Sequence, residues 1–236
     1  MLRIGHRGAA GYEPENTLLS IQKALDLDVE AIELDAHVCK SGEIVLIHDV
    51  KVDRTTESTG LIAKKNLTEL KKLNAGKGEK IPTLEEALDL INRKSKIIIE
   101  LKGKGTANSV YKIINKYISE KDWDWNDFLI SSSLIQELRD FKKLTSQIET
   151  GLIVNKKLIG ILGIIFKTPF GFIEMAESAN AKSIYLSKYF CNKKSISEAK
   201  NRGFAVLAWT INSPREIEKL KSCSIDGIIS DYPDRI

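Results

Sequence analysis

The chain has 236 residues, of which 42% are hydrophobic and 29% are charged, a composition typical of a soluble globular protein with one large core. Its net charge of +4 is mild and would suit an anionic substrate. No basic stripe with interleaved aromatic residues is present, so the composition argues against a nucleic-acid partner.

The cysteines and the N-terminus bear on the cellular compartment. Cys39, Cys191 and Cys223 are far apart and none belongs to a CxxC pair, which argues against a zinc cage and a disulfide framework. A strand pattern begins at residue 2, with no charged leader and long apolar core before it, so no signal peptide is expected. We predict a cytoplasmic protein, with a peripheral position at a membrane as the alternative.

Strand-like and helix-like segments alternate along the chain. Apolar patterns predict strands at 2–5, 31–35, 96–101, 127–132, 147–154, 183–186, 205–209 and 227–230. Amphipathic patterns predict helices at 17–27, 83–92, 107–119, 134–144, 172–179, 193–202 and 214–221. This alternation is typical of an α/β protein with a closed parallel (β/α)8 fold, the TIM barrel, and residues 1–236 are expected to form one such domain.

Two regions depart from a minimal barrel. Residues 36–47 are expected to form a hairpin arm after the second strand. Residues 49–81, with one helical piece at 67–73, are expected to form a small insertion that caps the barrel mouth. Only residues 231–236 follow the last strand, so the eighth outer helix should be short or absent.

The second strand carries Glu33 and Asp35, whose spacing of two puts both carboxylates on one face. If residues 41–42 are the centre of a two-residue turn, Asp35 stands opposite His48, about 5 Å away. In this interpretation His37 points away from Asp35 and lies outside the site. A solvated strand face is the alternative, but the apolar neighbours make unpaired acids costly there and favour a functional role.

Residues just after the strands of a parallel barrel gather at one mouth, where active sites form. Glu33, Asp35 and Glu100 would meet there from adjacent strands. Three carboxylates offer hard oxygen ligands, which suit one divalent metal ion, Mg²⁺ or Ca²⁺.

Histidines and cations fall at the same predicted mouth. His6 and His48 are candidates for general acid and base, and Arg7 and Lys102 could hold an anion such as a phosphate. Each has a plainer reading: His6 as a hydrogen-bonded strand end, Lys102 as an ion-pair partner of Glu100. Their convergence with the acids favours the functional reading.

Short motifs in register run nearly from end to end. They are HRG at 6–8, PENT at 14–17, ELD at 33–35, HD at 48–49, RTT at 54–56, IPTLEE at 81–86, ELK at 100–102, WTIN at 209–212 and DGIISDYP at 226–233. With these motifs the sequence resembles the glycerophosphodiester phosphodiesterase family, within the phosphatidylinositol-phospholipase-C-like barrels. One departure is the serine run at 131–133, where the family commonly has an aromatic residue.

The resemblance implies roles for particular residues. His6 and His48 would be the catalytic acid and base; Glu33, Asp35 and Glu100 the metal ligands; Arg7 and Lys102 the phosphate-binding pair; and the insertion a capping subdomain. Asn16 and Trp209 are further candidates for the substrate pocket, although Trp209 could equally be a core aromatic.

The implied activity is metal-dependent hydrolysis of glycerophosphodiesters, small-molecule substrates, to glycerol 3-phosphate and an alcohol. The nucleophile is either water or the neighbouring glycerol hydroxyl, which would give a cyclic phosphate first. A different metal-dependent hydrolase is disfavoured because no His-x-His pair is present, and a catalytically silent barrel because all five acid and histidine positions are filled.

The apolar segment 158–173 is interrupted by Lys167 and Pro169 and is too short to span a bilayer. A buried helix or a homo-oligomer contact is one reading. The alternative is a weak membrane-surface contact, which would favour lysophospholipase-D-like hydrolysis of membrane-associated lysolipids.

Overall fold

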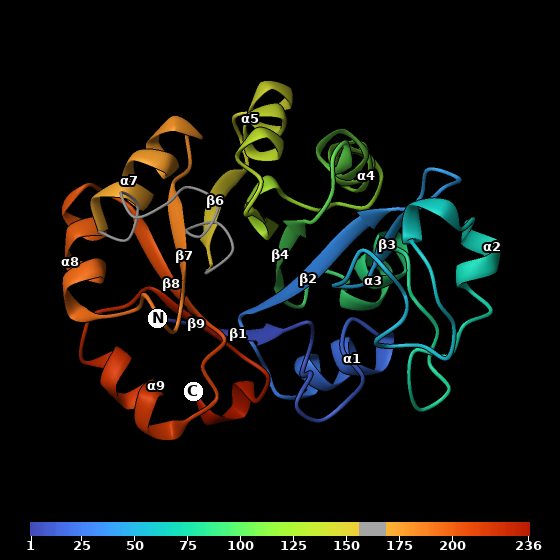
Figure 1. Ribbon diagram of the computed structural model, residues 1–236, viewed down its shortest axis with the longest axis horizontal. Helices are drawn as coiled ribbons and strands as arrows, with labels where there is room; N and C mark the ends of the chain where they lie inside the picture. The colour runs from blue at the N-terminus through green and yellow to red at the C-terminus, as the bar shows by residue number, and fades with distance from the viewer. Residues whose placement is uncertain (156–168) are drawn as a thin grey trace.

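The computed structural model describes residues 1–155 and 169–236, and its central element is a closed barrel of parallel strands (Figure 1). The strands follow one another in the order β1-β9-β8-β7-β6-β5-β4-β2, and β2 pairs with β1 to close the ring. Their bounds are β1 Leu2–His6, β2 Ala31–Val38, β4 Lys96–Leu101, β5 Phe128–Ser132, β6 Glu149–Val154, β7 Ser183–Ser187, β8 Ala205–Trp209 and β9 Gly227–Ser230. The predicted TIM barrel is confirmed.

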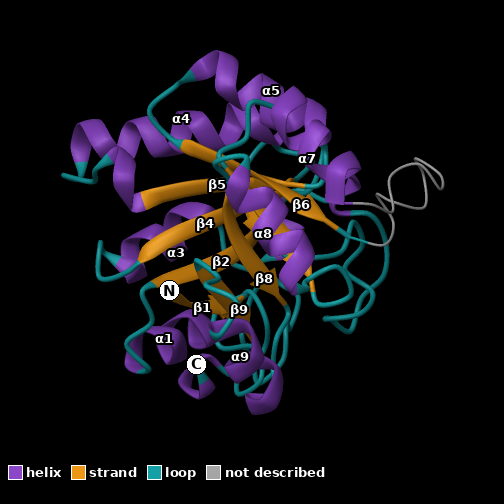
Figure 2. Cartoon of the chain, turned by 90° about the vertical axis from the view of Figure 1, so that its left-hand side faces the viewer, coloured by secondary structure: helices purple, strands orange, loops and turns teal. Residues whose placement is uncertain are grey.

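Helices surround the ring of strands on the outside (Figures 1 and 2). They are α1 Leu18–Asp26, α3 Leu84–Ile91, α4 Thr106–Glu120, α5 Ile135–Leu144, α7 Pro169–Ser178, α8 Lys193–Asn201 and α9 Pro214–Lys221. Helix α3 begins with a capping box, in which Thr83 Oγ1 accepts from Glu86 N at 3.2 Å and the Glu86 carboxylate accepts from Thr83 N at 2.8 Å. After β9 comes only a short 3₁₀ helix, η4 (Pro233–Arg235), as expected from the short C-terminal segment.

Two apolar layers explain which side chains point into the barrel. Ile97 and Ile99 of β4 pack outward in the large core beneath the helices, whereas Ile98 belongs to a smaller cluster inside the ring. Ile4 of β1 and Ala31 of β2 lie in the same inner cluster. Because side chains alternate along a strand, the residues two and four positions further on also point inward, at the carboxyl end of the barrel.

Strand β3 (Ile44–Leu46) pairs antiparallel with β2 and forms the predicted hairpin arm, but the register differs from the prediction by one residue. Ala36 faces Leu46, and Cys39 N donates to Glu43 O at 3.0 Å, so the loop holds the three residues 40–42. Gly42 adopts a φ of 102°, as three-residue hairpin loops require. Asp35 is therefore level with Ile47 and not with His48.

The insertion follows the hairpin and contains η1 (Ile62–Lys64) and α2 (Leu67–Leu70), seen on the side of the barrel away from α8 in Figure 1. It has its own small apolar cluster. This cluster consists of Cys39, Val45, Ile47, Val52, Ile62, Leu70, Ala75 and Ile81. Since the cluster combines hairpin and insertion residues, the insertion packs directly on the arm.

Candidate active site

Three carboxylates meet inside the barrel mouth. Asp35 on β2 is paired in register with Glu100 on β4, and Glu33 lies two residues before Asp35 on the same face. One oxygen from each lies within 4.8 Å of the others. Glu33 is 5% and Asp35 1% exposed, and Asp35 Oδ1 accepts no hydrogen bond from the described part of the chain. Buried carboxylates need a cation, so this donor set fits one hard divalent metal ion.

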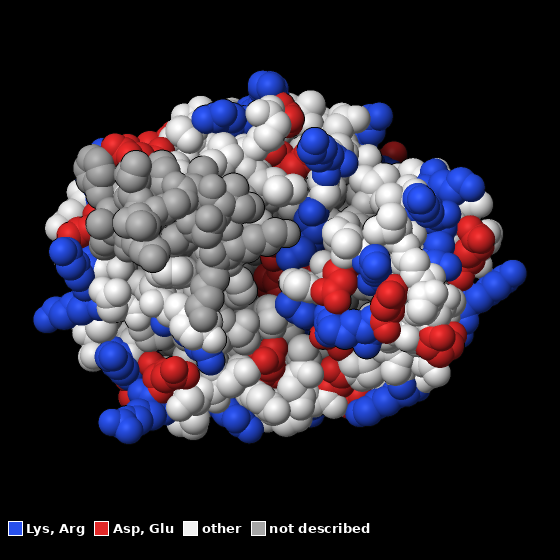
Figure 3. Space-filling view, viewed as in Figure 1, with Lys and Arg blue, Asp and Glu red and all other residues white. Residues whose placement is uncertain are grey.

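Two positive side chains border the acids. Lys102 Nζ lies 2.9 Å from Glu100 Oε1 and 3.4 Å from Asp35 Oδ1. Arg7 Nε lies 3.1 Å from Asp35 Oδ2, and the Arg7 backbone N–H donates to Glu33 Oε2 at 3.1 Å. Arg7 has a left-handed φ of 51°, which turns the chain at the end of β1 so that its backbone N–H faces the acids. Figure 3 shows acidic and basic side chains next to one another at a hollow near the centre of this face.

Burial and neighbouring charge shift the acids in opposite directions. Burial, with the nearby carboxylates, raises the pKa of Glu33 well above its usual range. Burial likewise raises the pKa of Glu100 to about 7. For Asp35 burial also opposes ionisation, but Lys102 and Arg7 outweigh it and lower its pKa. Without a metal ion, the cluster therefore holds protons near neutral pH.

His6 ends β1 and is held by an acid from the other end of the sequence. Its Nδ1 lies 2.6 Å from Asp231 Oδ1, directly after β9, and its Nε2 lies 4.0 Å from Glu33 Oε2. Asn212 Nδ2 donates to the second oxygen of Asp231 at 2.6 Å and fixes that carboxylate. With Nδ1 donating to Asp231, Nε2 is the nitrogen left to face the pocket.

His48 has a matching arrangement beyond β3. Its Nδ1 lies 2.5 Å from Asp49 Oδ1, and Arg54 Nε donates to Asp49 Oδ2 at 2.8 Å. Burial lowers the pKa of His48, so the ring is neutral at neutral pH. The hairpin register differs from the prediction, yet His48 still reaches the site, from the loop after the strand.

A pocket with about 470 Å³ of empty space connects these groups. It is lined by His6, Arg7, Glu33, His48, Glu100, Lys102, Ser131, Ile153, Asn155, Tyr185, Trp209 and Ile229. Trp209 donates through Nε1 to Tyr185 O at 3.0 Å, which sets its ring at the wall. The Tyr185 ring occupies the barrel interior beside Gly151, where a Cβ would lie only 2.2 Å from it.

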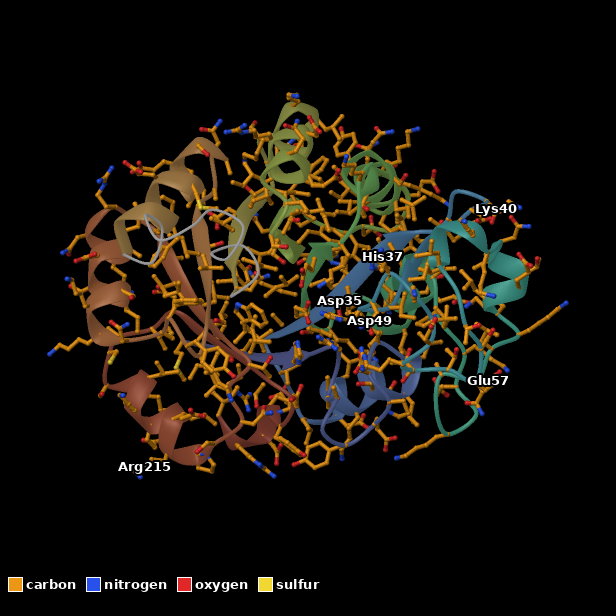
Figure 4. All side chains as sticks on the ribbon, viewed as in Figure 1. Asp35, His37, Lys40, Asp49, Glu57 and Arg215 are labelled. Carbon is orange, nitrogen blue, oxygen red and sulfur yellow. The ribbon has the colours of Figure 1, made fainter. Side chains whose placement is uncertain are left out.

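Two residues take places that differ from the sequence-based expectations. Asn16 is 2% exposed and lies behind Asp35, bonded to it, instead of among the residues that line this pocket. His37 was expected to point away, but it shares the inward face with Asp35, as a spacing of two requires. Its Nε2 lies 3.2 Å from His48 O, and His37 and Asp49, both labelled in Figure 4, line the same groove.

Asp231 and Asp49 support the two histidines, and the sequence analysis assigned neither a role. Their sequence signal is their position, because Asp231 directly follows the last strand and Asp49 directly follows a candidate histidine. The predicted membrane or oligomer segment 158–173 falls mostly outside the described residues; only its end lies in α7. Among residues 1–155 and 169–236, no helix is both long and apolar enough to cross a bilayer.

A barrel mouth that holds a cluster of carboxylates, two imidazoles and two positive side chains has the groups that hydrolysis of a phosphoric diester requires. Similarity to known proteins identifies the family within this class of hydrolases. The family described as "Glycerophosphoryl diester phosphodiesterase family" matches residues 6–235, and the chain belongs to it.

The chain is similar in sequence to individual members of the family over most of their length. The chain is 32% identical over 248 residues to the glycerophosphodiester phosphodiesterase of Caldanaerobacter subterraneus subsp. tengcongensis, covering 100% of this chain and 96% of the relative. A solved Oleispira antarctica phosphodiesterase in complex with the product sn-glycerol-3-phosphate matches with a TM-score of 0.87 and 31% identity, covering 99% and 94% of the two chains. A human lysophospholipase D is 26% identical over 263 residues, covering 99% and 84%. The chain is thus an enzyme of the glycerophosphodiester phosphodiesterase type.

Proposed function

We propose that the enzyme hydrolyses glycerophosphodiesters to sn-glycerol 3-phosphate and an alcohol, with one divalent metal ion at Glu33, Asp35 and Glu100. His6 and His48 act as the acid–base pair. The observation that carries the proposal is the shared pocket: both imidazoles have Nδ1 held by an aspartate, and both line the cavity that Glu33 and Glu100 line. The product bound in the Oleispira antarctica relative supports the same chemistry.

In this mechanism the phosphate of the substrate lies between Arg7 and Lys102, whose charges balance the phosphoryl oxygens. A bound Mg²⁺ or Ca²⁺ would supply further charge neutralisation at the carboxylates. One imidazole removes a proton from the attacking oxygen, a new P–O bond forms, and the P–O bond to the alcohol breaks. The other imidazole gives its proton to the departing alkoxide.

The attacking oxygen is either water or the neighbouring glycerol hydroxyl. The second route passes through a cyclic phosphate, which ³¹P NMR during turnover detects directly. Residues 49–81 serve as a cap within a single domain of residues 1–236, a role supported by their separate apolar cluster and by Arg54, which reaches back to the rim.

The test is release of glycerol 3-phosphate from glycerophosphocholine, glycerophosphoethanolamine and glycerophosphoglycerol, with Mg²⁺ or Ca²⁺. We expect turnover with at least one ion and its loss after dialysis against EDTA. Undiminished activity after EDTA would reject the carboxylate site, and no activity with any diester would reject the substrate class.

A second candidate is lysophospholipase-D-like hydrolysis, supported by a groove that adjoins the pocket at His48, Glu100 and Lys102. Val50 and Leu134 line it and are 58% and 38% exposed. Ser133 also lines it, where the family commonly has an aromatic residue, so the side chain at this point of the groove is a small one. A higher kcat/KM for lysophosphatidylcholine than for glycerophosphocholine, with flotation on liposomes, would favour this candidate.

A further inference from the structure

Arg54, in the insertion, joins two carboxylates that come from distant parts of the chain. Its Nε donates to Asp49 Oδ2 at 2.8 Å. Its Nη1 and Nη2 donate to the two oxygens of Glu15 at 2.8 Å and 2.7 Å. Its Nη2 also donates to Asp49 Oδ1 at 3.4 Å. The planar guanidinium thus engages Glu15 with two parallel bonds and Asp49 with two more, a geometry that a lysine ammonium cannot reproduce.

Each of these carboxylates holds a residue that lines the pocket. Asp49 Oδ1 lies 2.5 Å from His48 Nδ1. Glu15 Oε1 lies 2.7 Å from Arg7 Nη1. A continuous series of polar contacts therefore runs from His48 through Asp49, Arg54 and Glu15 to Arg7.

We propose that Arg54 is a positioning residue for hydrolysis: it fixes the Asp49 carboxylate so that His48 keeps Nδ1 protonated and presents Nε2 to the phosphate. The inference rests on the proposed role of His48. Glu15 serves as the anchor, because its two bonds fix the plane of the guanidinium. The strongly lowered pKa of Asp49, about 2, has the Arg54 hydrogen bond as its main cause and agrees with this contact.

The plain alternative is a surface ion pair without functional effect. The Arg54 side chain is 46% exposed, and ion pairs as exposed as this one add little to stability. Stability therefore cannot distinguish the two readings, whereas the orientation of His48 can. Without Arg54 the Asp49 side chain is free to rotate, and a misplaced catalytic group costs about 10²-fold in rate.

Kinetics of three variants make the first test. We expect Arg54→Ala to lower kcat for a glycerophosphodiester by about 10–100-fold with KM changed less than about 3-fold, and Arg54→Lys to recover only part of kcat. The matched control is Arg93→Ala, because Arg93 is 45% exposed and pairs with Asp127. Arg93 precedes β4 and Asp127 precedes β5, so the pair lies at the end of the barrel opposite the mouth. Equal kcat in Arg54→Ala and Arg93→Ala overturns the proposal.

A double-mutant cycle with Asp49→Asn identifies the route. If Arg54 acts through Asp49, Arg54→Ala lowers kcat by less than about 3-fold in the Asp49→Asn background, because the shared effect is already lost. Fully additive losses in kcat overturn the proposal.

A spectroscopic readout separates this inference from the proposed function. The chain has three histidines, so the long-range ¹H–¹⁵N NMR spectrum of the rings is simple to assign. We expect one tautomer for His48 in the wild type and a mixture in Arg54→Ala, with His6 unchanged. An unchanged His48 ring spectrum overturns the positioning role even if the wild type hydrolyses diesters, whereas an inactive wild type with the expected spectra rejects only the proposed function.

Discussion

Asn16 is hydrogen-bonded to Asp35 through both ends of its amide. Its Nδ2 donates to Asp35 Oδ2 at 2.8 Å, and its Oδ1 accepts from Asp35 N at 3.1 Å. The backbone of Asn16 has a left-handed φ of 57°, a conformation that asparagine tolerates better than most residues. One buried side chain thus fixes both the strand and the carboxylate at the proposed metal site.

We predict that Asn16→Ala weakens Mg²⁺ or Ca²⁺ binding by about 10–100-fold, the usual cost of losing a residue that orients a metal ligand. Calorimetric titration of the metal-free protein measures this. Asn92→Ala is the control, because Asn92 also has a left-handed φ (43°) but caps α3 away from the mouth. Equal metal affinities in the two variants would contradict the role given to Asn16.

His6→Ala and His48→Ala should each lower kcat by about 10²–10⁴-fold, because each removes a proton-transfer group. Both variants should still bind the metal ion, since neither histidine belongs to the carboxylate cluster. Steady-state kinetics together with metal-induced shifts in melting temperature check both points. A variant with near-wild-type kcat would remove that histidine from the mechanism.

Metal binding should become tighter as the pH rises. In the metal-free protein burial raises the pKa of Glu100 from 4.5 to about 7, so the folded state binds more protons than the unfolded state between these values. The contribution of this group to stability is therefore lost as pH rises through about 7. A metal ion displaces the proton and restores stability, so its effect on the melting temperature should be larger at pH 8 than at pH 6.

Thermal melts of wild type and Glu100→Gln, with and without the metal ion, provide the measurement. The variant should show a smaller pH dependence when metal-free and no metal-induced rise at either pH. An equal rise at pH 6 and pH 8 in the wild type would contradict the proton competition.

The contact between the His37 ring and the backbone carbonyl of His48 should affect turnover. Burial is the main cause of the lowered pKa of His37, so the ring is neutral and its Nε2–H donates to His48 O at 3.2 Å. We expect His37→Phe to reduce kcat by about 10-fold, because the loop that carries His48 loses an anchor. His37→Gln, which keeps a donor, should retain more activity than His37→Phe; the reverse order in the same assay argues against this anchor.

Much of the site was predictable because it depends on local periodicity. A spacing of two places Glu33 with Asp35 and Glu100 with Lys102 on the same strand faces, whatever the rest of the chain does. The same rule places His37 on that face, so the prediction that His37 points away from Asp35 was wrong. The hairpin register was less predictable, because residues 40–42 can support either a two- or a three-residue loop.

The sequence by itself determined the alternation of strands and helices and which acids share a strand face, since both follow from patterns within a few residues. Only the tertiary structure decided which residues hold those groups in place. Asp231 and His6 are 225 residues apart in sequence, and they meet because β9 pairs with β1 when the barrel closes. Arg54 reaches Glu15 and Asp49 because the insertion packs on the hairpin arm. Asn16 reaches Asp35 because its own left-handed backbone directs its side chain there. Neither effect has a local periodic pattern in the sequence.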